Sequence, residues 1–158
     1  MLIDPFFDSV ASPILNDLEY RSQKSYRAHK DVSVYSHSLS VASYAYLYAK
    51  KKNLSIDYKA LIRGALLHDY YLYDWHHSGE GHKLHGFRHP FFALHNASKR
   101  FDLTPKDRNI IVSHMFPVVF WVFPRSKEAR LVIKADRHCA WEETRHKKVK
   151  EPIIRPAQ

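Results

Sequence analysis

Apolar residues recur every three or four positions through most of the chain, which is the spacing of amphipathic α-helices. No segment shows a convincing alternating strand pattern, although the apolar run at residues 118–123 is short enough to be extended. The sequence therefore predicts an all-α fold of about six helices. We expect them over residues 5–20, 31–52, 57–71, 90–101, 105 to about 114, and 126–146.

Local signals place several of these boundaries. Pro13 marks a possible break in the first helix, and Pro90 suits the first position of the fourth, where a missing N–H costs nothing. Thr104 and Ser126 are good N-cap residues for the fifth and sixth helices. Residues 74–88 hold three of the four glycines and four histidines without a steady period, so we predict a long, ligand-facing loop there.

The chain has the length of one domain. Its 158 residues are 45% hydrophobic, and no repeat or linker divides them. We expect a single domain over residues 1–158, with an N-terminal helix at 5–20, a core over about 30–146 and a frayed basic tail at 147–158.

Composition excludes several function classes. A single cysteine, Cys139, rules out an intramolecular disulfide framework and a thiolate zinc finger, and indicates a reducing compartment, by default the cytoplasm. Four glycines are too few for a P-loop or a Rossmann fingerprint. The longest apolar run contains Pro117 and is far shorter than a membrane span, so we expect no membrane partner.

Charge and histidine content point to an anionic partner and to metal. The formal net charge is +9, and 12 histidines exceed what core packing requires. The basic residues are spread from Arg21 to Arg155 and match no helix-turn-helix, zinc-finger or RNP pattern. Sequence-specific binding of nucleic acid is therefore not expected, and a small phosphorylated molecule is the favoured partner.

Five polar residues interrupt apolar helix faces and should therefore point inward. A buried carboxylate is costly unless it is paired or coordinated, and a divalent metal would explain buried aspartates and histidines together. The five are His37, His68, Asp69, His114 and Asp136. His29, His95, His138 and His146 are expected to be structural or exposed.

The order of these residues resembles a known family. His37, then the doublet His68-Asp69 after a small-residue and leucine helix, then Asp136, looks like the HD superfamily of metal-dependent phosphohydrolases. The resemblance implies a helical bundle in which His37, His68, Asp69 and Asp136 hold one metal. Two-metal members add two histidines, which His89 and His114 resemble, so that Asp69 would bridge both ions.

The resemblance also implies the chemistry. Asp69 and His68 would be central to catalysis by two divalent ions, with iron or manganese favoured over zinc, cobalt, nickel or magnesium. A hydroxide formed on the metal would attack phosphorus in a phosphoester or phosphoanhydride, with a nucleotide or dinucleotide as the expected substrate. From their positions alone, the candidate substrate-binding residues are Lys83, His85, Arg88 and Arg125, and His85 or His77 would protonate the leaving group.

Other functions stay open on the sequence. One alternative is a non-catalytic helical module that binds nucleic acid or an acidic partner through its positive charge. Another is a lyase or an oxygenase built on the same metal scaffold, because a fold and a ligand set do not fix the reaction.

Overall fold

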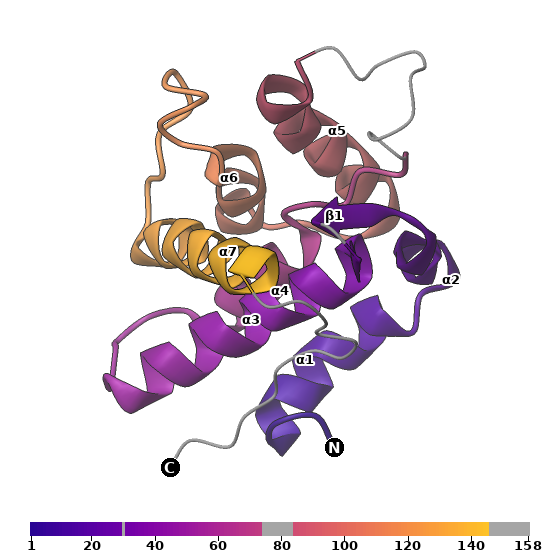
Figure 1. The fold of residues 1–158 in the computed structure, drawn as a ribbon. Coiled ribbons are helices and arrows are strands. Elements are labelled where there is room, and N and C mark those ends of the chain that lie inside the picture. The colour runs from indigo at the N-terminus through magenta and orange to yellow at the C-terminus, as the bar shows by residue number, and fades with distance from the viewer. Residues whose placement is uncertain (30, 74–83, 146–158) are drawn as a thin grey trace.

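The structure, a computed structural model, describes residues 1–29, 31–73 and 84–145, and within them the chain is mainly helical, with one short two-stranded sheet (Figure 1). The predicted all-α class is confirmed, with seven α-helices in the described residues. In chain order the elements are α1 (Pro5–Leu15), α2 (Leu18–Arg21), the 3₁₀ helix η1 (Ser22–Ser25), β1 (Arg27–His29), β2 (Val32–Ser33), α3 (Val34–Lys51), α4 (Tyr58–Leu67), α5 (His85–Arg100), α6 (Pro105–Ser113) and α7 (Lys127–Arg145).

The helix α4 is the centre of the fold. It packs against α1, α3, α5, α6 and α7, and seven of its ten residues are buried. Asp57 caps its N-terminus by accepting a hydrogen bond from the Ala60 N–H at 2.9 Å. Gly64 allows close approach of α6, since a Cβ there would lie 2.5 Å from Ile110 Cγ2. The small and aliphatic residues that predicted this helix therefore also decide which helices it can contact.

The expected N-terminal helix is two helices. Pro13 lies inside α1, and the interruption comes later, at Asn16, which ends α1. Asp17 then caps α2 by accepting a hydrogen bond from the Tyr20 N–H at 3.0 Å. A second N-cap close to the end of the first helix restarts the helix in a new direction, which gives seven helices in place of about six.

A short antiparallel hairpin precedes α3, where the sequence predicted helix from residue 31. Strands β1 and β2 pair with a register irregularity between Arg27 and His29. Helix α3 begins only at Val34, because Ser33 is the N-cap and its Oγ accepts a hydrogen bond from the Ser36 N–H. The hairpin is short, yet it positions His29 beside α3.

Two further expectations are corrected. Helix α5 begins at His85, so Pro90 lies inside the helix and not at its first position, and only residues 84–88 of the expected loop are described, with 74–83 outside. Residues 118–121 form turns and Val122 a bend, so this run is not a strand. The predicted basic tail, 147–158, also lies outside the described residues.

None of the described helices has the length and apolar character needed to cross a membrane.

Candidate metal centre

Five helices bring the six predicted ligands together, and three of the six lie at helix C-termini. His68 is the C-cap of α4 with Asp69 directly after it, and His114 is the C-cap of α6. The other three lie within helices: His37 in the first turn of α3, His89 in α5 and Asp136 in α7. The side chains of all six are buried or nearly so, although they come from positions up to 99 residues apart.

The two oxygens of Asp69 face two different groups of side chains. Oδ2 lies 3.5 Å from His68 Nε2 and 4.0 Å from His37 Nε2. Asp136 Oδ1 completes this side, at 3.0 Å from His37 Nε2 and 3.7 Å from His68 Nε2. Oδ1 of Asp69 lies 3.2 Å from His89 Nε2 and 3.4 Å from His114 Nε2. The arrangement therefore has one carboxylate between two donor sets.

Hydrogen bonds at Nδ1 fix the orientation of three of the imidazoles. His68 Nδ1 lies 2.7 Å from the Ala65 carbonyl and His114 Nδ1 lies 2.7 Å from the Ile111 carbonyl. The last carbonyls of a helix have no partner within it, so a histidine at the C-cap can bond to one of them. His89 Nδ1 contacts its own helix, 2.9 Å from the His85 carbonyl. A carbonyl carries no proton, so each ring donates from Nδ1 and presents Nε2 to Asp69.

The geometry at His89 and His114 calls for a cation. Their Nε2 atoms lie 2.8 Å apart, and in the neutral tautomers just described both nitrogens carry lone pairs. Two lone pairs at this distance repel unless a proton or a metal ion lies between them. In addition, His68 Nε2 and Asp69 Oδ1 are buried and have no hydrogen-bond partner within the described residues. Imidazole and carboxylate donors of this kind fit a divalent transition metal.

Electrostatics in the site favour ionised carboxylates. Burial alone would raise the pKa of Asp69, but the imidazoles of His68, His114 and His89 outweigh it and hold the pKa well below the ordinary value. Burial lowers the pKa of His114, and the neighbouring His89 and His68 add to the effect. Burial alone would lower the pKa of His37 and of His68, but the neighbouring carboxylates outweigh it and raise the pKa of both. Metal binds anionic aspartates and neutral imidazoles, so these two rings would release a proton on binding it.

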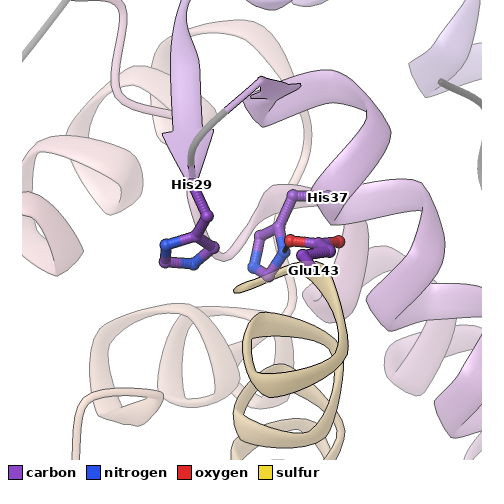
Figure 2. A group of neighbouring side chains, drawn as sticks. All are labelled: His29, His37 and Glu143. Atoms are coloured by element: carbon purple, nitrogen blue, oxygen red, sulfur yellow. Dashed lines mark hydrogen bonds and ion pairs between the residues drawn. The ribbon is translucent and has the colours of Figure 1, made fainter. Parts of the chain in front are cut away.

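Sequence reasoning missed two residues that adjoin these ligands, Glu143 and His29. Glu143 lies on α7, is buried, and has its Oε2 2.9 Å from His37 Nδ1 (Figure 2). His29, expected to be structural or exposed, ends β1 with its ring edge-on to that of His37, with centroids 5.0 Å apart. The amphipathic pattern of α7 was the available signal for Glu143, which is seven residues beyond Asp136 and so on the same face.

A pocket of about 210 Å³ opens onto the cluster. Its described lining holds no lysine or arginine; it comprises Ala28, His29, Asp69, Tyr71, His85, Gly86, His89, His114, Met115 and Asp136.

The predicted substrate-binding residues are placed differently around this pocket. His85 lines it, with its Nδ1 2.9 Å from Tyr73 Oη. Arg88 is exposed, with its guanidinium over the Phe92 ring, and Arg125 is exposed too; neither is among the lining residues. Lys83 and His77 lie outside the described residues.

Comparison with protein families accounts for this arrangement. The family model described as the HD domain matches residues 34–141. The chain belongs to the HD-domain family. The match contains all six predicted ligands and confirms the resemblance drawn from their order. Comparison with curated proteins and with solved structures finds no match.

Membership of this family indicates the general class of reaction. The family consists commonly of metal-dependent phosphohydrolases, and the clustered histidines and aspartates agree with divalent metal binding. Two residues stand outside the matched range: His29 precedes it and Glu143 follows it.

Proposed function

We propose that this HD domain hydrolyses a phosphoester or phosphoanhydride bond of a small anionic substrate, with nucleotides and dinucleotides as the first class to test. The position of Asp69 carries the proposal, because its two oxygens face two separate donor sets. His37, His68, Asp69 Oδ2 and Asp136 would hold one divalent ion. Asp69 Oδ1, His89 and His114 would hold the other.

Bound divalent ions would supply a water of lowered pKa and positive charge for phosphoryl oxygens. Iron or manganese is the favoured metal, because imidazole and carboxylate ligands without thiolates suit both. The described lining offers the substrate no lysine or arginine, so the metal centre itself would provide the positive charge that a phosphate requires.

The pocket residues supply the remaining functions. His85 Nδ1–H can donate a hydrogen bond to Tyr73 Oη, which leaves Nε2 as the nitrogen that gives or takes a proton. We assign the imidazolium form of His85 as the general acid: Nε2–H gives its proton to the leaving-group oxygen as the phosphorus–oxygen bond breaks, and the ring becomes neutral. Tyr71 also lines the pocket and its ring packs edge-on against His85, which restricts the orientation of the imidazole.

A helical module that binds nucleic acid or an acidic partner is less well supported. Such a module would use exposed basic side chains and would leave the buried donor set without a role. A buried carboxylate between two pairs of imidazoles is costly to maintain, and metal binding explains why the chain contains one.

Metal analysis followed by a phosphate-release screen tests the proposal. Protein purified anaerobically should contain up to two equivalents of transition metal and should release phosphate from at least one nucleotide, dinucleotide or phosphosugar. Asp69→Asn should lose both properties, because the amide has no charge to hold two cations. Asp102→Asn is the matched control, since Asp102 is exposed. Metal retained at full occupancy in Asp69→Asn, or no release by fully loaded wild type, would overturn the proposal.

A further inference from the structure

His37 differs from the other candidate ligands in what holds its ring. His68, His89 and His114 each place Nδ1 against a backbone carbonyl, whereas His37 Nδ1 lies 2.9 Å from the carboxylate oxygen Glu143 Oε2. A carboxylate accepts a stronger, charge-assisted hydrogen bond than a carbonyl does. It also makes the opposite ring nitrogen a better donor to a metal. Unlike a carbonyl, this partner can be removed by substitution.

Helix α7 contacts both nitrogens of this ring. Asp136 Oδ1 lies 3.0 Å from His37 Nε2, and Glu143 Oε2 lies 2.9 Å from Nδ1. The two carboxylates are seven residues apart, which is two turns and about 10 Å along an α-helix. An imidazole fits between them. The ring of His37 therefore cannot rotate about its Cβ–Cγ bond without losing a hydrogen bond at one end or the other.

The burial of Glu143 suggests a specific role. The residue is 5% exposed, and its second oxygen, Oε1, is buried without a hydrogen-bond partner in the described residues. A carboxylate in such surroundings is destabilising unless its interactions compensate. Two histidines, His29 and His37, lie beside Glu143. One nitrogen or oxygen atom from each of these three side chains lies within 4.8 Å of the other two (Figure 2).

We propose that Glu143 is a positioning residue of the metal centre, which holds His37 with a proton on Nδ1 and Nε2 directed at Asp69 and Asp136. Because His89 and His114 have their own partners, the effect is confined to the ion held by His37. Glu143 lies beyond the residues matched by the HD-domain model, so this contact is not among those that the family match covers. The inference rests on the proposed metal centre but not on the substrate.

Isothermal titration calorimetry of metal-free protein with Mn²⁺ tests the inference without a substrate. Wild type should show two binding events. Glu143→Ala should weaken one of them about 10- to 100-fold, the usual effect of removing a partner that orients a ligand, and leave the other within about threefold. Glu143→Gln keeps the volume and one acceptor oxygen, so it should recover much of the loss. Glu142→Gln, which removes the same charge at the neighbouring position of α7, is the matched control and should bind like wild type.

Unfolding of the metal-free variants separates positioning from a structural role. Glu143→Gln should unfold close to wild type while its affinity for one Mn²⁺ is reduced, and this variant serves if Glu143→Ala does not fold. Unchanged affinity, or an equal loss at both sites, would overturn the proposal. A third equivalent of Mn²⁺ that is lost in Glu143→Gln would also overturn it, because Glu143 and His29 would then bind a cation directly.

The outcomes for Glu143 and for the proposed function can be told apart. If wild type binds two Mn²⁺ with the expected dependence on Glu143 but releases no phosphate, only the proposed function fails. If wild type releases phosphate and Glu143→Ala binds metal like wild type, only the positioning role fails.

Discussion

Replacing Gly64 with alanine should force α4 and α6 apart. The added Cβ would lie 2.5, 2.8 and 2.9 Å from three carbons of Ile110, whereas ordinary contact begins at 3.4 Å. The shortest approach therefore needs about 0.9 Å of relief, from 3.4 minus 2.5 Å. Ile110 is fully buried, so its side chain has no open space in which to turn away. The backbones of the two helices must move instead.

The expected loss of stability is about 2 kcal/mol. Overpacking a core costs about 1 to 3 kcal/mol, and three contacts below 3.0 Å place this substitution near the upper value. Alanine recovers up to about 1 kcal/mol, because glycine is a poor residue for the interior of a helix. The movement also reaches the metal centre, since α4 ends at His68 and α6 at His114. Metal affinity should therefore fall together with stability.

Urea unfolding measures the effect, with Gly86→Ala as control. Gly86 is also helical, but a Cβ there would meet its nearest atom, Met115 Cε, at 3.9 Å, so the control should be neutral or slightly stabilising. Ile110→Ala removes Cγ2 and Cδ1, two of the three carbons that lie too close, together with Cγ1, and should cost about 2 to 5 kcal/mol alone. The double variant with Gly64→Ala and Ile110→Ala should lose at least about 1 kcal/mol less stability than the sum of the two single losses. A Gly64→Ala protein as stable as wild type, or strict additivity in the double variant, would refute the reasoning.

Two further predictions concern charged groups away from the metal centre. Arg63→Met removes the guanidinium whose Nε donates to the buried carboxylate of Asp107 at 3.1 Å, and should cost about 2 kcal/mol in urea unfolding. Lys59→Met, an exposed cation of the same helix, should change stability little, and an equal effect of both would contradict the prediction. Burial would raise the pKa of Glu128, but the hydrogen bond from the Asp57 N–H and other partners hold it below 4.5. Its ionised form therefore stabilises the fold above pH 4.5, and the advantage of wild type over Glu128→Gln should shrink as the pH falls below that value. A difference that stays constant or grows in acid would contradict this sign.

Most of the helices could be predicted from local pattern. Periodic apolar residues predicted α3, α4, α6 and α7 to within a few residues, and N-cap residues placed the starts of α6 and α7, because capping and amphipathic spacing act over one or two turns. Two helix boundaries were predicted wrongly, and helix propensity does not distinguish the alternatives. Asp17 caps a second helix where one continuous helix was expected, and α5 contains Pro90 where the helix was expected to begin.

Five of the six candidate ligands could be predicted as well, because polar residues that interrupt an apolar face must be buried with a partner, whereas His89 followed only from the family resemblance. Their division into two sets followed from the family resemblance and not from the residues themselves, since it depends on where each oxygen of Asp69 points after five helices have packed. Local pattern determined most of the helices and the inward polar residues, because both follow from interactions between near neighbours. The contact of Glu143 with His37, 106 positions apart, and the placement of His29 beside that ring were decided by tertiary structure, because only the packing of α7 and the hairpin against α3 brings them within reach.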